Sequence, residues 1–259
     1  DLLADVRRDP RHEMLPVVMV TGAVGLVTRR LAAAAGVSAF LPKPFDAEEL
    51  VLCLTSLLNQ KRIVDGLEQA GRVLVSLART IEARDPYTAG HGQRVALIAG
   101  GMGSDLKLGG EEMRALEEGG LLHDIGKVGI RDALLAKQGP LDAEEQREFR
   151  THPEVGVRMV ENLLTMAHTL PVIRSHHERW NGTGYPDRLL EHGIPVVARI
   201  TAYADVYDAL ASARPYRAAY PHAAAMDIIR EESRRGLLDP DLLSVFERAV
   251  RLVDDRALA

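Results

Sequence analysis

Cysteine is almost missing from this 259-residue sequence, which contains a single one, Cys53. One cysteine excludes a disulfide within the chain, and the apolar helical surroundings of Cys53 favour a small core residue over a nucleophile or a metal ligand. Long apolar runs are also missing: none approaches the ~18 residues of a membrane span, and the first residues have no signal-peptide pattern. We therefore expect a cytoplasmic protein with no membrane partner.

An excess of positive charge is missing as well, because the formal net charge is −5 at pH 7. An acidic chain does not bind a nucleic-acid polymer through bulk charge, so any anionic ligand must be held by a local cationic site. The chain does have 46% hydrophobic residues, which is ample for a packed core. Its length allows one large domain or two smaller ones.

The first 59 residues have the order of an α/β unit. The pattern predicts strand, helix, strand and helix in turn, at residues 15–22, 27–35, 39–41 and 47–58. Gly36 is a typical end for the first helix, and Asp46 is a good N-cap for the second. This order predicts parallel strand pairing and a doubly wound sheet.

Residues 60–84 predict a long linker helix. Its apolar side chains are spaced alternately four and three apart, as in a coiled-coil seam. These seam residues are Ile63, Leu67, Ala70, Leu74, Leu77 and Ile81. Gly66 and Gly71 weaken the helix. Two interpretations stay open: the seam joins two protomers of a homodimer, or part of it packs on the following domain.

Residues 85–259 predict an all-α domain, because no strand pattern competes with the helical ones. The expected helices lie at about 88–105, 110–126, 142–150, 153–164, 170–178, 195–210, 222–235 and 239–253. Asp142 followed by Glu145 has the character of a capping box, and Pro153, Pro195 and Pro240 sit where first-turn prolines belong. The fold class is therefore mainly α.

Three ionisable residues stand out in the helical run from Leu121 to Lys127. His123 and Asp124 are adjacent among apolar neighbours, and Lys127, four residues after His123, is expected on the histidine's side. An unpaired buried charge is costly, so these groups need partners. One interpretation is a local hydrogen-bond network at a helix end; the other is an aspartate that lends one oxygen to each of two adjacent ions.

Further imidazoles and carboxylates favour the metal interpretation. Six of the nine histidines fall between His91 and His177, and several lie in apolar helical runs. Metal coordination is the simplest reason to bury such groups together. Without thiolates the set favours Fe or Mn, with Zn, Co or Ni as alternatives. Seven candidate ligands suit two ions ~3.5–4 Å apart and bridged by Asp124.

Six segments in order resemble one known family, the HD-GYP phosphodiesterases of the HD superfamily, which use metal ions to hydrolyse cyclic di-GMP. The segments are 82–91, 121–127, 152–156, 176–186, 202–210 and 214–217, and the resemblance covers about residues 70–255. Position by position, it implies these metal ligands: His91, His123, Asp124, His152, His176, His177 and Asp205.

The same resemblance implies the residues that meet the substrate. Lys127, Arg214 and Arg217 match positions that contact substrate phosphates, so Asp124 and Lys127 are the expected catalytic residues. Tyr185 belongs to the signature loop Gly184–Pro186, which shapes the site and in this family is also a surface for partner proteins.

Two departures from the family pattern bear on the site. Asn181 stands where many members have Asp, a conservative change in a turn. Some members add a third metal through a carboxylate one turn before the first histidine, where this chain has Tyr87. Two ions are therefore expected, although Glu82 is near enough in sequence to complicate the count.

The first 60 residues resemble the C-terminal half of a response-regulator receiver domain. Thr21 matches the family's switch hydroxyl and Lys43 its phosphate-contacting lysine. The phosphoacceptor aspartate of that family belongs on an earlier strand, whereas Asp5 and Asp9 lie in a helical or loop stretch. No phosphorylation site is therefore assigned.

These resemblances imply a cyclic di-GMP phosphodiesterase of the two-component type, with pGpG as the product and GMP as a further one. Two bridged ions would supply a hydroxide nucleophile and clamp the phosphate. One alternative is a catalytically silent HD-GYP module that senses the nucleotide or docks on a partner protein. Another is an HD-type phosphohydrolase that acts on nucleoside phosphates.

Overall fold

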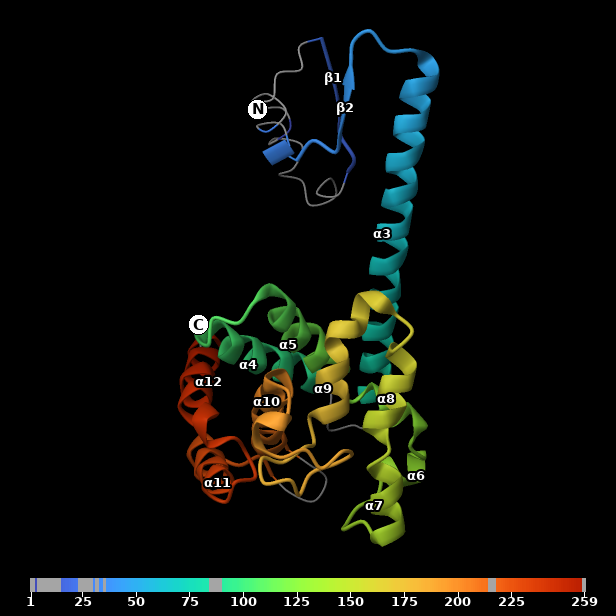
Figure 1. Ribbon diagram of the computed structural model, residues 1–259. Helices are drawn as coiled ribbons and strands as arrows, with labels where there is room; N and C mark the ends of the chain where they lie inside the picture. The colour runs from blue at the N-terminus through green and yellow to red at the C-terminus, as the bar shows by residue number, and fades with distance from the viewer. Residues whose placement is uncertain are drawn as a thin grey trace. The chain divides into compact units, whose positions relative to one another are not determined.

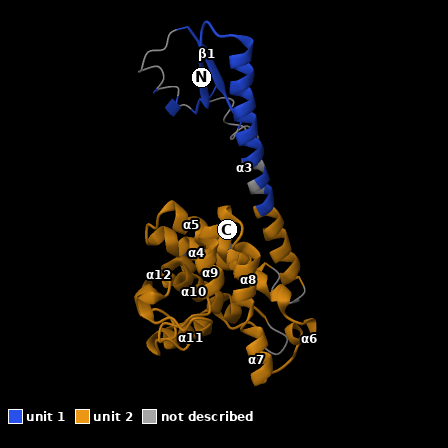
Figure 2. Ribbon diagram, turned by 45° about the vertical axis from the view of Figure 1, so that its right-hand side comes forward, with its two compact units in different colours: residues 1–70 blue, residues 71–259 orange. Residues whose placement is uncertain are grey.

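The computed structural model describes residues 3, 15–22, 30, 33–34, 36–83, 90–213 and 218–257. The chain forms two compact units, residues 1–70 and 71–259 (Figure 2). The boundary falls within helix α3 (Ala47–Glu82), which therefore contributes to both units and lies partly in the segment predicted as a linker.

Unit 1 contains the predicted strand pair. Strands β1 (Val18–Thr21) and β2 (Ala39–Pro42) pair in parallel, with Val18 opposite Ala39. The parallel pairing expected from the element order is thus confirmed. The helix predicted for 27–35 lies mostly outside the described residues, as do Asp5 and Asp9. The receiver resemblance itself stays a prediction.

Helix α3 is longer than predicted. It runs without a break for 36 residues, whereas the pattern indicated one helix ending at Leu58 and another beginning near Gln60. The expected break was wrong, because Leu58, Asn59 and Gln60 include no proline or glycine that would end a helix. The predicted N-cap is present: the Asp46 carboxylate accepts a hydrogen bond from the Glu49 N–H at 2.7 Å.

Unit 2 is helical, as expected for residues 85–259 (Figure 1). After α3 its longer helices are α4 (His91–Asp105), α5 (Gly110–Leu122), α7 (Ala143–Phe149), α8 (His152–Val160), α9 (Leu170–Ser175), α10 (Val196–Ala211), α11 (His222–Arg234) and α12 (Leu243–Ala257). One core packs around Tyr203 and Phe246, which are fully buried with side chains of α4, α5 and α11. The capping box of α7 is confirmed, since the Glu145 N–H donates to Asp142 and the Asp142 N–H donates to Glu145.

The seam of α3 packs partly within the chain. Leu74 and Ile81 are each 8% exposed and lie in a second core with Leu122 and Ile125. The packing interpretation is therefore confirmed for this end of the seam. Ile63, in unit 1, is 64% exposed. The side chain at seam position 67 is not among those that the structure describes.

One helix boundary changes the local geometry of the site. The sequence predicted a helix over 110–126, but α5 ends at Leu122 and the chain continues in a short 3₁₀ turn, η2 (Ile125–Gly129). The helical spacing of Leu121, Leu122 and Ile125 hid this change, because both helix types can bury the same apolar positions.

The short helix α6 (Asp132–Leu135) and the turn η3 (Leu164–Thr169) were not predicted. Within the part of the chain that the structure describes, no helix has the length and apolarity of a membrane span.

Candidate metal centre

The ends of several helices of unit 2 meet at one place. His91 is the first residue of α4, His123 follows the last residue of α5, and His152 is the first residue of α8. His176 follows the end of α9, and Asp205 lies within α10. Residues far apart in sequence are thereby brought together by the packing of the helices on which they lie.

All seven predicted ligands lie in two neighbouring groups. The first contains Asp124, His152, His176 and His177, and the second contains His91, His123 and Asp205. Within each group, one potential ligand atom from every residue lies within 4.8 Å of the others. The structure thus places together the whole set that the sequence indicated.

Hydrogen bonds fix the tautomer of three of the imidazoles. Nδ1 of His123 lies 2.8 Å from the Gly120 carbonyl oxygen, and Nδ1 of His152 lies 2.8 Å from the Phe149 carbonyl oxygen. Nδ1 of His176 lies 3.1 Å from the carbonyl oxygens of α9. A carbonyl can only accept, so each Nδ1 carries a proton, and in the neutral form of the ring Nε2 presents its lone pair.

These Nε2 atoms face one another across the centre. Nε2 of His152 lies 3.3 Å from Nε2 of His176, and Nε2 of His91 lies 3.2 Å from Nε2 of His123. In the first pair both atoms are acceptors, so they cannot hydrogen bond with each other. A cation placed among such lone pairs would satisfy them, and the arrangement with Nδ1 held by carbonyls is typical of metal-binding histidines. The residues present therefore fit a metal ion.

Asp124 lies between the two groups. Its Oδ1 is 3.4 Å from Nε2 of His152, whereas its Oδ2 is 3.4 Å from Nε2 of His123. Oδ2 also pairs with the Lys127 ammonium at 2.5 Å. Burial alone would raise the pKa of this carboxyl, but Lys127 and the surrounding imidazoles hold the pKa well below its usual range. Each carboxylate oxygen thus faces a different group of ligands.

The pKa values of His176, His177 and His91 are shifted in different directions. Burial, reinforced by His123 and His152, lowers the pKa of His176 to about 3. Burial and His176 lower the pKa of His177 well below its ordinary value. For His91, burial opposes protonation, but hydrogen bonds to Asp205 and Asp208 outweigh it and raise the pKa to about 10. Without a metal ion, the His91 ring is therefore protonated on both nitrogens, with Nδ1 facing Asp208 and Nε2 facing Asp205.

Asp208 is a site residue that the sequence analysis did not single out. Its Oδ2 lies 2.7 Å from Nδ1 of His91, and Arg94 donates to its two oxygens at 2.5 and 3.0 Å. It thereby orients the ring of His91 as a carboxylate behind a metal-binding histidine does. The signal was present, since Asp208 lies three residues after Asp205 and hence on the same side of α10.

The Gly184–Pro186 loop lies against the first group. The Tyr185 ring is centred 4.8 Å from the His177 ring, and the Arg150 guanidinium lies 5.1 Å from the Tyr185 ring centre. The buried Glu178 holds the chain after the loop, because its carboxylate accepts hydrogen bonds from three successive N–H groups, those of residues 187–189. Tyr185 is thus fixed beside the candidate ligands.

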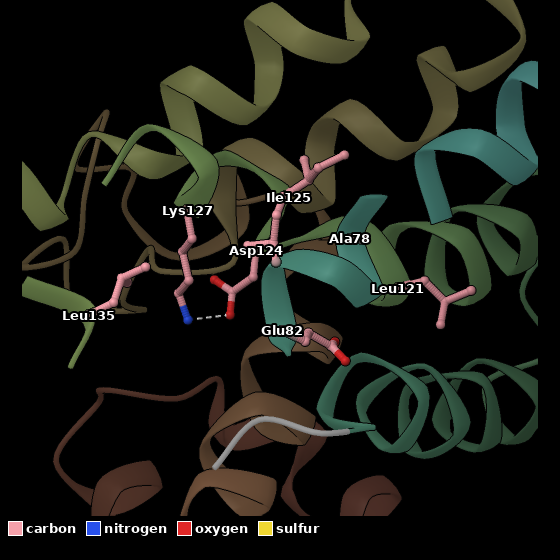
Figure 3. Close-up of a pocket in the computed structure, with 8 residues that line it drawn as sticks. Ala78, Glu82, Leu121, Asp124, Ile125, Lys127 and Leu135 are labelled. Atoms are coloured by element: carbon pink, nitrogen blue, oxygen red, sulfur yellow. Dashed lines mark hydrogen bonds and ion pairs between the residues drawn. The ribbon is translucent and has the colours of Figure 1, made fainter. Parts of the chain in front are cut away.

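Lys127 was expected on the side of His123, one helical turn on. Its ammonium pairs with Oδ2 of Asp124 (Figure 3), the oxygen that also lies 3.4 Å from Nε2 of His123. Lys127, Asp124 and Glu82 line one small pocket at the end of α3. Arg214 and Arg217, the other predicted phosphate contacts, lie outside the described residues, as does Tyr87. Among the residues described, Glu82 belongs to neither candidate metal group.

The chain is similar to proteins that contain an HD domain. A family profile described as HD domain matches residues 76–242. The cyclic di-GMP phosphodiesterase response regulator RpfG of Xanthomonas campestris pv. campestris is 36% identical over 257 residues, which span 91% of this chain and 68% of that protein. The 3'3'-cGAMP-specific phosphodiesterase 3 of Vibrio cholerae is 34% identical over 71% of this chain, a match that spans 40% of its own length.

Solved structures agree on the fold. Bd1817, an HDG"Y"P protein from Bdellovibrio bacteriovorus, has a TM-score of 0.52 at 21% identity, over 62% of this chain and 51% of that one. The HD domain of the L. monocytogenes phosphodiesterase PgpH has a TM-score of 0.52 at 14% identity, over 71% of this chain and 99% of that one. The profile match over residues 76–242 shows that the chain belongs to the HD-domain family, and its relatives include proteins named as cyclic-dinucleotide phosphodiesterases.

Proposed function

We propose that the chain is a cyclic di-GMP phosphodiesterase that works with two divalent metal ions. The observation that carries this proposal is the pair of imidazole groups whose Nε2 atoms converge on the two sides of Asp124. One ion would be held by His152, His176 and His177, the other by His91, His123 and Asp205, and Asp124 would bridge them. Nitrogen and oxygen ligands without thiolate favour iron, with manganese as the alternative.

The relatives support the substrate class. Two of the proteins reported above are named as phosphodiesterases of cyclic di-GMP and of 3'3'-cGAMP. The chain spans 68% of the first and only 40% of the second, so the activity of those whole proteins is carried over here as a proposal. By analogy with the response regulator, the proposed enzyme is of the two-component type.

The chain's own residues would bind and orient the substrate phosphate. When bound, two divalent ions activate water at neutral pH and neutralise charge on a phosphodiester. Lys127, already held at Asp124, would place a further positive charge at the phosphate, and Tyr185 would bound the substrate on the side of His177. Arg214 and Arg217 would add two cations. Hydrolysis of one phosphodiester bond of cyclic di-GMP would yield linear pGpG, and hydrolysis of the second would yield GMP.

A second substrate, 3'3'-cGAMP, is favoured by a specific similarity. The 3'3'-cGAMP-specific phosphodiesterase 2 of Vibrio cholerae is 39% identical over 163 residues, a span that covers 61% of this chain and 31% of that protein. Both cyclic dinucleotides present the same pair of phosphodiesters to a metal centre and differ in one purine. The two substrates are therefore candidates for the same site.

The proposal is tested by metal analysis together with turnover. The purified chain, loaded with Fe²⁺ or Mn²⁺, should contain about two ions and hydrolyse cyclic di-GMP, with 3'3'-cGAMP, linear pGpG and a nucleoside triphosphate assayed in parallel. Asp124→Ala should lose bound metal and turnover together. Metal binding without turnover of any of these substrates would favour a sensing or docking module instead, and preferential turnover of the nucleoside triphosphate would favour the other type of HD phosphohydrolase.

We further propose two protein partners. The exposed part of α3 in unit 1, where Leu58 is 56% and Ile63 is 64% exposed, would join two copies of the chain. Replacing both by glutamate should lower the mass measured by sedimentation from that of a dimer to that of a monomer, with the metal content unchanged. An unchanged mass would exclude this surface.

The loop Gly184–Pro186 would be the surface for a different protein.

A further inference from the structure

The N-cap position of helix α4 provides no capping side chain. The first N–H groups of a helix have no partner within it and are usually satisfied by an N-cap side chain. The N-cap residue of α4 is Gly90, which has φ of 71° and offers no side chain. The next residue is His91, the candidate ligand on which the second metal group depends. Among the residues described, support for the turn that carries His91 comes from outside α4.

Glu82 contributes to this support from the end of α3. Its Oε1 accepts a hydrogen bond from the Gly92 N–H at 2.8 Å. Glu82 is the last residue of α3, and Gly92 directly follows His91. A carboxylate at the first turn also interacts favourably with the positive end of the helix dipole. The end of one helix thus caps the start of the next.

The space around Gly92 is shaped for this contact. A Cβ atom at this position would lie 2.6 Å from Oε1 of Glu82 and 3.3 Å from the Gly120 carbonyl oxygen. That carbonyl is the acceptor for Nδ1 of His123. There is therefore no room for a side chain at Gly92, where the Glu82 carboxylate, the first turn of α4 and the carbonyl that orients His123 meet.

The end of α3 touches the other side of the site as well. Ala78 and Ile81 are buried in the second core with Leu122 and Ile125, the residues that flank His123 and Asp124 in sequence. Figure 3 shows Glu82 at the end of α3, with the ion pair of Asp124 and Lys127 among the residues that line the same pocket. The last turn of α3 is thus in contact with the supports of His91 and of the His123–Asp124 pair.

We propose that Glu82 is a positioning residue that sets the place of His91 through the first turn of α4, so that the geometry of the metal centre depends on where α3 ends. Glu82 acts through a hydrogen bond and not as a ligand. Its effect on turnover rests on the proposed function, whereas its effect on metal affinity does not. Helix α3 continues into unit 1, so a displacement along it would reach His91 by this contact.

Three substitutions separate a hydrogen-bond role from a ligand role. Glu82→Gln keeps an oxygen that can accept from the Gly92 N–H but removes the charge, whereas Glu82→Ala and Glu82→Asp lose the acceptor or its reach. We expect Glu82→Gln to bind Co²⁺ and turn over substrate nearly as the unchanged chain does. Glu82→Ala and Glu82→Asp should weaken Co²⁺ binding by about 10- to 100-fold and lower kcat more than they raise KM. Glu48→Gln, an exposed change on the same helix, is the matched control.

The readouts are Co²⁺ affinity with its visible absorption spectrum, the melting temperature, and kcat and KM on cyclic di-GMP, all in the full chain. Equal loss of Co²⁺ by Glu82→Gln and Glu82→Ala would overturn the proposal and make Glu82 a ligand. A lower melting temperature with unchanged Co²⁺ binding would reduce Glu82 to a structural role. If no substrate is turned over even by the unchanged chain, the proposed function fails but the Co²⁺ comparison still decides this inference.

Gly92→Ala provides a second variant if Glu82→Ala does not fold. The added Cβ would lie 2.6 Å from Oε1 of Glu82, so the carboxylate would have to move away although residue 82 is still glutamate. We expect the same loss of Co²⁺ affinity as for Glu82→Ala, and in the double variant a smaller loss than the sum of the two. Losses that simply add would show that the two residues act independently, and would overturn the proposal.

Discussion

Lys127 is the residue at which a structural and a chemical role can be separated most directly. Its ammonium pairs with Asp124 at 2.5 Å, and its side chain is 20% exposed. Lys127→Met keeps much of the apolar stem and removes the charge. We expect near-normal melting temperature and metal content, and kcat/KM on cyclic di-GMP lower by ~10²-fold, as for the loss of one preorganised electrostatic contact. A kinetic loss below about threefold would remove Lys127 from the catalytic residues.

His91 should release a proton when metal binds. Its pKa of about 10 means that it is protonated at pH 7.5, whereas His176, with a pKa of about 3, is already neutral. A ligand must be deprotonated to bind, so about one proton should be released per chain at pH 7.5, and apparent affinity should rise with pH until the pKa of His91 is passed.

Calorimetry of metal binding in buffers of different ionisation enthalpy measures this proton. Asp208→Asn is a useful comparison, because it removes one of the carboxylates that raise the pKa of His91 and should reduce the number of protons released. Binding heats that do not change with the buffer at pH 7.5 would contradict the prediction.

The site residues could be named from the sequence, but their arrangement could not. His123 and Asp124 were found because charged groups in an apolar helical run need partners, and the remaining ligands because their segments resemble known ones. Which oxygen of Asp124 faces which group depends on helix packing, which no local pattern contains. The spacing of Asp208 from Asp205 indicates only that the two lie on the same side of a helix; that Asp208 orients the His91 ring depends on how α4 and α10 pack.

At the scale of elements, the two ends of the α3 seam should respond differently to truncation. Leu74→Ala opens a cavity in the second core and should reduce the free energy of unfolding by about 2–5 kcal/mol. Ile63→Ala changes a side chain that is 64% exposed within one chain, so at concentrations low enough to keep the chain monomeric it should change the free energy of unfolding by less than about 0.5 kcal/mol. Urea denaturation at such concentrations measures both. Equal effects there would mean that the chain itself covers Ile63 in solution.

The close approach of η2 and α8 gives a second prediction at this scale. A Cβ at Gly126 would overlap the His152 carbonyl oxygen and lie 2.5 Å from the Gly156 nitrogen, both of which are backbone atoms that cannot move independently. Gly126→Ala should therefore destabilise unit 2 by about 1–3 kcal/mol and weaken metal binding by displacing His152.

Gly129→Ala is the matched control for that change. There the added Cβ would lie 3.3 Å from Cγ1 of Val155, a side chain that can shift, so melting temperature and metal affinity should stay close to those of the unchanged chain. Two variants with the same loss would show that the short turn tolerates no added methyl anywhere, and that the contact with His152 is not the cause.

Helix existence was predictable at this scale, and helix ends were less so. The apolar spacing found α4, α5, α7, α8, α9, α10, α11 and α12, while the end of α5 was placed four residues late. The switch to a 3₁₀ turn after Leu122 is driven by tertiary contacts: Gly126 must fit against α8, and the chain must turn so that Asp124 faces the centre. Such constraints act between elements and produce no periodic spacing of apolar residues in the sequence.

At the scale of the whole molecule, the candidate ligands link α4, the junction of α5 with η2, α8, α9 and α10. The unfolded chain cannot hold these groups together, so metal binding should stabilise the folded state by mass action, by about 2.7 kcal/mol at a free concentration 100 times the dissociation constant. Removing the metal with a chelator should lower the melting temperature, and adding Mn²⁺ or Fe²⁺ should restore it.

Asp124→Ala separates this linkage from a general effect of the chelator. Without the carboxylate that faces both groups, the melting temperature should be close to that of the metal-free chain and should no longer respond to chelator or to added ion, as followed by calorimetry. The alanine also removes the counter-charge of Lys127, so Lys127→Met in the same background shows how much of any further change comes from that lysine. An Asp124→Ala chain that still gains stability from Mn²⁺ would mean that the histidines and Asp205 hold an ion without the bridge, and the two-ion arrangement centred on Asp124 would be wrong.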